Sequence, residues 1–241
     1  MASRTQRVLA RLAVAALGVS LVSGCSVYEA ARTSDFAEQS ATTIAVAGER
    51  AMDDVESLRL TGSVWEDGRQ FFVDLHVDRA GRCSGSLSLE GRHVDLRRVG
   101  GTTWFKGDAA FYNMVTRGRD VPRSELDRLS RKWITVEGKT FGRVCDLDAL
   151  LKDFSAFEHE KGQEVEATRG TEVELDGARA VEISARPGGV ALQRTWVLSE
   201  SPHRVVKMTV EGGREPVVLA LSEFDEPFEV EAPNGGDTAR L

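Results

Sequence analysis

The chain has no surplus of basic residues. Its 38 Asp and Glu outnumber its 31 Lys and Arg, which gives a formal net charge of −7. Nucleic-acid binding requires a basic face that neutralises phosphates, so this balance argues against a nucleic-acid partner. It also argues against a polybasic patch that would hold the protein on an anionic membrane surface.

The chain also lacks an apolar segment of the roughly 20 residues that a transmembrane helix needs. Residues 12–22 form a shorter uncharged apolar run, preceded by Arg4, Arg7 and Arg11. A positive segment followed by such a run is typical of a signal peptide. Residues 22–25 read Val-Ser-Gly-Cys, an apolar residue and two small residues before a cysteine, which is the pattern of a bacterial lipoprotein signal.

We therefore predict a signal peptide over residues 1–24 and lipidation of Cys25, with the protein held at the outer, extracytoplasmic face of the cell membrane. Two or more acyl chains, such as palmitate, give stable anchoring. Because the signal contains three arginines and no acid, the mature part is more negative than the whole chain. The alternative is an ordinary signal peptide that contains a cysteine.

Cysteine is scarce, with three in the chain. If Cys25 carries the lipid, Cys83 and Cys145 remain as a pair in an oxidising compartment, which favours a disulfide between them. The alternative is two separate buried thiols. Neither cysteine lies in a Cys-x-x-Cys motif or a Cys/His cluster, so the sequence does not support a zinc site.

Catalytic motifs are also missing. Residues 138–140, Gly-Lys-Thr, resemble the end of a phosphate-binding loop, but position 133 is Trp where that loop needs Gly. Residues 81–85 resemble a nucleophile elbow only loosely, because Cys83 replaces the serine. A cysteine nucleophile with His76 or His93 as base is the enzymatic alternative to the disulfide.

Metal-binding patterns are absent as well. The four histidines, His76, His93, His159 and His203, show no paired-ligand spacing. Residues 146–148 lack the glycine and distal glutamate of a calcium loop and are better explained as a helix start. The acidic stretch 158–166 is typical of a solvated loop. We therefore predict no enzyme activity, no cofactor and no metal.

The first half of the chain combines one helix with a run of strands. Residues 40–55 carry apolar residues at helical spacing. Apolar and polar residues then alternate from residue 58 to 96, which is typical of strands with one apolar face. Glycine-containing turns at residues 66–68, 80–81, 90–91 and 100–101 separate these strands. The pattern predicts an antiparallel meander.

A helical insert and a second meander follow. The alternation stops from residue 108 to about 157, where residues 109–115, 123–131 and 146–154 are predicted as short helices, with Ser124 and Asp146 as N-caps. Strand patterns return between residues 165 and 221. We predict an α+β fold: one large curved antiparallel sheet, a half-open β-barrel of about eleven strands, with the helical insert covering its concave apolar face. The predicted organisation is a tether over residues 25–38, a single domain over 39–233 and a flexible tail over 234–241.

Two further segments resemble a known family. Residues 196–205, Trp-Val-Leu-Ser-Glu-Ser-Pro-His-Arg-Val, and residues 221–233, Leu-Ser-Glu-Phe-Asp-Glu-Pro-Phe-Glu-Val-Glu-Ala-Pro, are similar to segments of the LolA-like half-barrel lipoproteins, above all the actinobacterial LppX/LprG group. The lipoprotein signal agrees with this. The resemblance implies an apolar cavity between sheet and helices that holds acyl chains. The Cys83/Cys145 pair departs from the mycobacterial members, which suggests a branch with a different ligand.

The residues predicted to line such a cavity share inward positions on the expected strands and the insert. They are Leu60, Val64, Phe71, Val73, Leu75, Leu87, Val94, Leu96, Trp104, Phe111, Leu192 and Trp196. An apolar void of this kind stays dry and can accept an apolar ligand. The alternative is that these residues form an ordinary packed core.

The sequence thus predicts a lipoprotein that binds or transfers a lipid, a lipidated molecule or another apolar ligand in the envelope. The alternative, from a different class, is a non-enzymatic regulator or sensor that contacts a membrane-protein partner, as RseB-type proteins do.

Overall fold

The computed structural model describes residues 33–66, 68–116, 119–136, 145–154, 166–186 and 189–240. The predicted signal peptide and Cys25 lie outside these residues. Ser34 to Leu241 form one compact unit. Residues 34–38 were predicted as part of a tether, but in the structure they pack on the domain. Phe36 and Ala37 are buried, and the Ser34 hydroxyl donates a hydrogen bond to Glu172 over 2.7 Å. The domain therefore begins earlier than residue 39.

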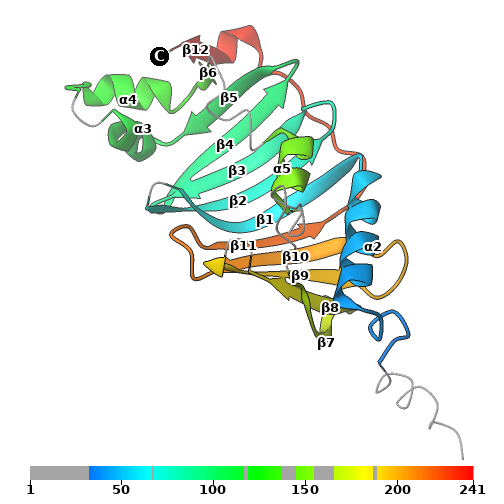
Figure 1. The fold of residues 1–241 in the computed structure, drawn as a ribbon. Coiled ribbons are helices and arrows are strands. Elements are labelled where there is room, and N and C mark those ends of the chain that lie inside the picture. The colour runs from blue at the N-terminus through cyan, green and yellow to red at the C-terminus, as the bar shows by residue number, and fades with distance from the viewer. Residues whose placement is uncertain are drawn as a thin grey trace, which may run out of the picture. The chain divides into compact units, whose positions relative to one another are not determined.

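The unit is built on a single unclosed sheet of twelve strands (Figure 1). Their order across the sheet is β12-β6-β5-β4-β3-β2-β1-β11-β10-β9-β8-β7. All neighbours are antiparallel except β12 and β6, which are parallel. The strands are β1 (Ser57–Glu66), β2 (Arg69–Asp78), β3 (Cys83–Leu89), β4 (Arg92–Val99), β5 (Thr102–Gly107), β6 (Trp133–Val136), β7 (Thr168–Leu175), β8 (Ala178–Ala185), β9 (Leu192–Leu198), β10 (Val205–Glu211), β11 (Val217–Ser222) and β12 (Thr238–Arg240).

The two predicted meanders join at the centre of this sheet. Strand β1 pairs with β2 on one side and with β11 on the other, so that Leu60 lies between Leu75 and Leu221. The first meander and the second are thus continuous, and the α+β prediction of one large antiparallel sheet is confirmed.

Two glycines let neighbouring strands approach closely. Gly62 and Gly85 both have φ of 146°, a backbone conformation that other residues rarely adopt. A Cβ atom on Gly62 would lie 2.0 Å from the Val218 carbonyl oxygen, and one on Gly85 would lie 2.1 Å from that of Asp74. Glycine at these positions is therefore part of what allows the central strands to pair.

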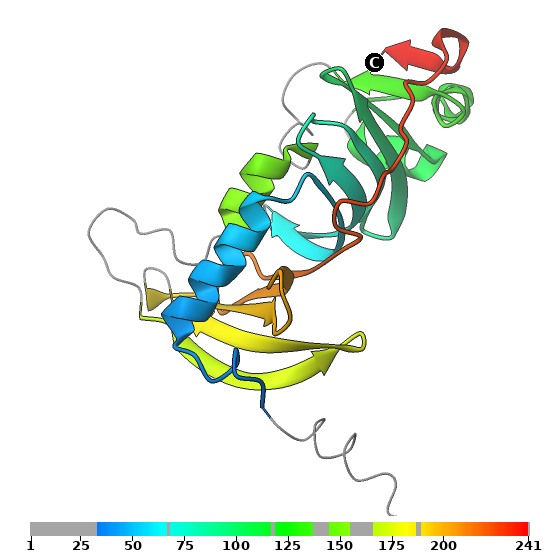
Figure 2. The same ribbon diagram turned by 90° about the vertical axis from the view of Figure 1, so that its right-hand side faces the viewer.

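The α-helices among the described residues are α2 (Ala41–Asp53), α3 (Ala109–Val115), α4 (Arg123–Leu129) and α5 (Leu147–Phe154). Figure 2 shows α2 and α5 on one face of the sheet and the C-terminal segment along the other. The Ser40 hydroxyl caps α2, and Asp146 accepts a hydrogen bond from the Ala149 amide at the start of α5, as predicted. The cap predicted for α4 is wrong, because Ser124 lies inside the helix and Pro122 precedes it.

Two short strands were not predicted. Strand β6 lies inside the segment predicted as a helical insert, and it pairs with β5 through Ile134 and Phe105. The predicted flexible tail instead forms a 3-10 turn over Gly235–Asp237 followed by β12, which pairs with β6. The tail therefore covers one edge of the sheet.

Candidate ligand-binding face

One face of the sheet, called here the inward face, carries the apolar side chains that alternate along β1 to β4. Leu60, Leu75 and Leu96 are at most 3% exposed, and Val73, Leu87 and Val94 are also buried. Val64 and Phe71 share this face near the ends of their strands and are only partly buried. The inward positions predicted for β1 to β4 are therefore brought together on one surface.

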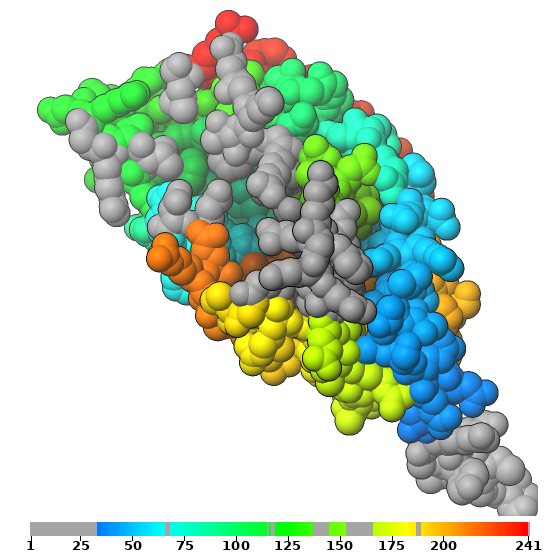
Figure 3. Space-filling view, in the orientation of Figure 1, coloured from blue at the N-terminus to red at the C-terminus, as the bar shows by residue number. Residues whose placement is uncertain are grey.

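Helices α2 and α5 cover part of the inward face. Ile44 and Met52 of α2 and Leu147 of α5 belong to the same buried cluster as the inward side chains of β1 to β4. Helix α2 packs closely on β9 and β10, since a Cβ on Gly48 would lie 3.1 Å from Val197. Figure 3 views the molecule from the side of these helices. Both the N-terminal helix and the insert thus contribute to the cover.

A second cluster lies where α3 and α4 pack at the β5–β6 end of the sheet. Phe111 of α3 meets Phe105 edge to face, with ring centroids 5.7 Å apart, and Leu126 and Ile134 complete the contact. Tyr112 is fully buried, and its hydroxyl accepts a hydrogen bond from the Gly107 amide. Burial raises the pKa of Tyr112. Phe111 is thus inward, as predicted.

Three predicted lining residues lie on the opposite, outward face. Trp104 pairs with Arg97, whereas its neighbour Phe105 pairs with the inward Leu96. Trp196 pairs with Glu182 and Lys207, and the Lys207 ammonium lies 4.7 Å from the centre of its ring. Leu192 is four residues from Trp196 in the same strand and so shares its face. The prediction that these three point inward is wrong.

The inward face also contains residues that were not predicted. The register adds Leu58, Val77 and Phe105 to it from the first meander, and Ile183 and Val197 from the second. In β5 the inward positions are Thr103, Phe105 and Gly107, and Trp104 falls between them on the outward face. Phe105 could therefore have been found by extending the strict alternation of the preceding strands into β5. Ile183 alternates with the polar residues Glu182 and Ser184 and carries such a signal. Val197 lies between Trp196 and Leu198, so alternation could not have identified it.

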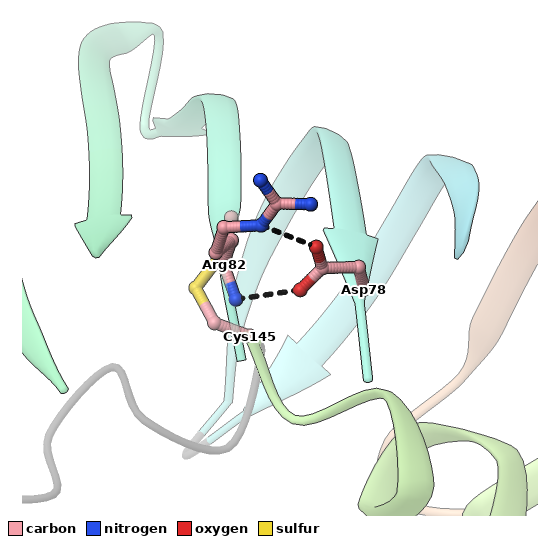
Figure 4. Close-up of a disulfide and its surroundings, with 4 residues drawn as sticks. Asp78, Arg82 and Cys145 are labelled. Carbon is pink, nitrogen blue, oxygen red and sulfur yellow. Dashed lines mark hydrogen bonds and ion pairs between the residues drawn. A yellow bond between two sulfur atoms is a disulfide. The ribbon is translucent and has the colours of Figure 1, made fainter. Parts of the chain in front are cut away.

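The predicted disulfide between Cys83 and Cys145 is confirmed (Figure 4). Both cysteines are buried, and the nearby turn is closed by Asp78, which accepts hydrogen bonds from the Arg82 amide and Nε. With Cys83 oxidised, the enzymatic alternative of a cysteine nucleophile is wrong for this structure. His76 points to the outward face, where it bonds Glu223 over 2.6 Å.

The outward face is polar and is crossed by the C-terminal segment. Arg59 pairs with Asp74 over 2.8 Å and with Glu223 over 2.7 Å. The hydrogen bond from Arg59 lowers the pKa of Asp74, and those from His76 and Arg59 lower the pKa of Glu223. The bonds to both carboxylates raise the pKa of Arg59. This network ties β1 and β2 to the residue that follows β11.

Two pockets open beside the C-terminal segment. One of about 650 Å³ lies between Ser84, Asp95 and Trp133 on the sheet and residues 229–231. The other, of about 430 Å³, lies between the Arg79–Arg82 turn and residues 225–228. The larger pocket is mostly polar, whereas the smaller one combines charged side chains with apolar surface from residues such as Phe228. Both lie beside the C-terminal segment and not under α2 and α5.

Within the described ranges, no three His, Cys, Asp or Glu side chains are grouped as a metal site. Asp148 of the weak calcium-like pattern pairs with Arg79. Residues 138–140, His159 and all but Glu166 of the acidic stretch 158–166 lie outside the described residues. In the part of the chain that the structure describes, no helix has the length and apolar character to cross a membrane.

Solved structures share this fold. LprF from Mycobacterium bovis matches with a TM-score of 0.56 and 15% identity, over 81% of this chain and 97% of LprF. The lipoprotein LppX from Mycobacterium tuberculosis matches with a TM-score of 0.50 and 13% identity, over 79% of this chain and 98% of LppX. No protein-family model and no curated protein sequence matches the chain. The resemblance to the LppX/LprG group is thus confirmed at the level of the fold.

Proposed function

We propose that this protein is an extracytoplasmic lipoprotein, anchored through acyl chains on Cys25, that binds or transfers a lipid or another apolar ligand on its inward face. The observation that carries the proposal is the continuous apolar cluster that lines one face of the sheet under α2 and α5. The other face carries the Arg59 ion-pair network and only separate apolar side chains, such as Phe72 and Trp196. An apolar surface between a sheet and helices is where an acyl chain is favourably buried. The shared fold of LprF and LppX supports this assignment.

The predicted lining residues that lie on the inward face, Leu60, Val64, Phe71, Val73, Leu75, Leu87, Val94, Leu96 and Phe111, are proposed to contact the ligand. The proposal includes no catalytic step. Cys83 is held in a disulfide, and His76 is bonded to Glu223 on the other face.

Adjacent phenylalanines provide a matched test. Phe71 is inward and partly buried, whereas Phe72 is outward and 53% exposed. Native mass spectrometry of the purified protein is expected to show a co-purifying apolar ligand, and a fluorescent fatty acid is expected to bind. Phe71→Gln should weaken that binding by about tenfold, because it removes an aromatic side chain from the apolar face. Phe72→Gln should leave it unchanged.

The proposal fails if no ligand co-purifies and the fluorescent fatty acid does not bind. It also fails if Phe71→Gln and Phe72→Gln have equal effects, because binding would then be independent of the inward face. Circular dichroism of both variants establishes that each remains folded.

A regulator that contacts a membrane-protein partner is the second candidate. Phe72 and Val218, 53% and 47% exposed, lie on either side of Ser63 on the outward face. Exposed apolar side chains grouped in this way are typical of protein contacts. Crosslinking followed by affinity purification should then recover a stoichiometric membrane protein that is lost in Phe72→Gln, with no lipid on the inward face. Recovery of lipid-loaded protein without such a partner would reject this candidate.

A further inference from the structure

Arg98 places a cation on the mostly apolar inward face. It follows the buried residues Val94 and Leu96 at the same alternating positions of β4. Its cross-strand partners are Cys83 on β3 and Thr103 on β5, which are 0% and 2% exposed. The Arg98 side chain therefore projects from the inward face, next to the disulfide, and is itself partly buried.

The guanidinium of Arg98 has no counter-charge among the described residues. Its Nε atom is shielded from solvent and has no hydrogen-bond partner there. Arg204 shows the contrast: its Nε is also unpartnered, but its Nη2 pairs with Asp225. Since an arginine keeps its charge at any physiological pH, a charge in apolar surroundings is stabilised by an anion that binds there.

The strands around Arg98 offer no such anion. Among the inward positions of β1 to β6, the charged residues are Glu66, Arg69, Arg92 and Arg98. The one acid, Glu66, pairs in register with Arg69, at the opposite end of the strands from Arg98. Arg69 and Arg92 are exposed and begin their strands, beside the hairpins at the other end of the sheet. Arg98 is therefore the one inward cation in these strands that is partly buried, with its Nε shielded from solvent.

The acidic residues that follow the disulfide along the chain have other partners. Asp146 accepts a hydrogen bond from the Ala149 amide at the start of α5. Asp148, in the first turn of the same helix, pairs with Arg79. Neither of these carboxylates pairs with Arg98, which leaves its guanidinium without an ion-pair partner among the described residues.

We propose that Arg98 binds the anionic head group, a carboxylate or a phosphate, of an amphiphile whose acyl chain lies on the inward face. This inference rests on the lipid-binding function proposed above and specifies the class of its ligand. A guanidinium donates parallel N–H groups to two oxygens of such a group, which fixes the position of the head relative to the chain. The buried disulfide and Leu96 beside it provide apolar contact for the first carbons of the chain.

The test compares ligands that differ only in the charge of the head group. Full-length protein is stripped of bound lipid and titrated with dodecanoic acid, methyl dodecanoate and dodecyl phosphate, each displacing a neutral fluorescent alkyl probe. The unsubstituted protein should bind the acid or the phosphate at least about tenfold more tightly than the ester. Whichever anion binds more tightly identifies the head group as carboxylate or phosphate.

Arg98→Gln should abolish this preference and leave the affinity for the ester unchanged, which also shows that the variant is folded. Arg98→Lys should retain part of the preference, because it keeps the charge and loses the paired geometry. The matched control is Arg97→Gln. Arg97 is the neighbouring arginine on the outward face, where it lies over the Trp133 ring, and its loss should leave the preference intact.

Equal affinity of the unsubstituted protein for acid, phosphate and ester would overturn the role of Arg98 while leaving lipid binding in place. A preference that survives in Arg98→Gln would do the same. Failure of all three ligands to bind would instead overturn the proposed function, and this inference with it.

Discussion

Gly85 shows how much of this sheet depends on single residues. Its φ of 146° and the 2.1 Å approach of a would-be Cβ to the Asp74 carbonyl oxygen both oppose any side chain. Gly85→Ala should therefore lower the free energy of unfolding by more than about 2 kcal/mol, because a neighbouring backbone cannot move aside cheaply. Urea denaturation followed by fluorescence measures this change.

The control for that substitution is Gly91, in the β3–β4 turn. It also has a positive φ, of 74°, but open space surrounds its would-be Cβ. Gly91→Ala should cost about 1 kcal/mol, the backbone penalty alone. Equal losses in the two variants would show that the close strand contact at Gly85 contributes nothing.

The Arg59–Asp74 ion pair, another feature of single residues, predicts how the free energy of unfolding depends on pH. The pKa of Asp74 is lowered from 3.8, chiefly by the hydrogen bond from Arg59. Its contribution to stability is therefore present above pH 3.8 and is lost as the pH falls through the lower folded-state pKa. Asp74→Asn should cost roughly 0.5 kcal/mol at neutral pH, since the pair is half exposed, and should flatten the loss of stability in acid.

Chemical denaturation at a series of pH values between neutrality and acid measures that difference. Glu229→Gln, a substitution of an exposed carboxylate in the C-terminal segment, is the control and should retain the slope of the unsubstituted protein. An unchanged acid slope in Asp74→Asn would contradict the assignment.

The sequence prediction placed two tryptophans, Trp104 and Trp196, on the wrong face of the sheet, and each lies beside a basic residue in the structure. Phe71, Val73 and Leu75 alternate with mostly polar neighbours, and this pattern alone was enough to place them inward. Hydrophobicity then assigned the tryptophans to the same face. In the structure, Trp196 is outward and buried, with the Lys207 ammonium over its ring. A cation attracts the face of an aromatic ring and its aliphatic stem covers apolar surface, so a tryptophan can be buried outside the core.

Among the elements, the disulfide has the clearest consequence, because it ties β3 to the start of α5. It closes a loop with a sequence separation of 62 residues, for which the chain-entropy model gives about 4 kcal/mol. Cys83→Ala with Cys145→Ala should lower the free energy of unfolding by roughly that amount and loosen α5 from the inward face.

Denaturation with and without a reducing agent tests this prediction. The reducing agent should destabilise the unsubstituted protein and have no further effect on the double variant. A Cys25→Ser chain is the control, and it should respond to the reducing agent as the unsubstituted protein does. Equal stability of the oxidised and reduced forms would contradict the prediction.

Element length explains which parts of the fold were missed. The long strands of the first meander display several periods of alternation and were predicted from sequence. Strand β6 has four residues and β12 has three, too few to show a period, and β12 lies in a polar, glycine-containing stretch. Their pairing is set by tertiary contacts, such as Ile134 against Phe105, that local sequence does not encode.

For the whole molecule, the proposed anchor predicts where the protein is found. Cys25→Ser should move it from the detergent-rich phase to the aqueous phase in a detergent phase-partitioning experiment, because acyl chains on Cys25 are the proposed attachment. Cys83→Ala with Cys145→Ala should remain in the detergent-rich phase. If the Cys25→Ser variant remained in the detergent-rich phase, another segment would have to attach the protein to the membrane.

The pairing of β1 with β11 has a consequence for the order in which the protein folds. Each meander consists mainly of hairpins between successive strands, which can form before the rest of the domain has folded. The joint between them unites residues 59–64 with residues 217–222, near opposite ends of the domain. Contacts so distant in sequence form slowly, so the edge of β1 stays open until β11 arrives. Until the two meanders join, that unpaired edge is the place where a chaperone or a second unfolded chain would bind first.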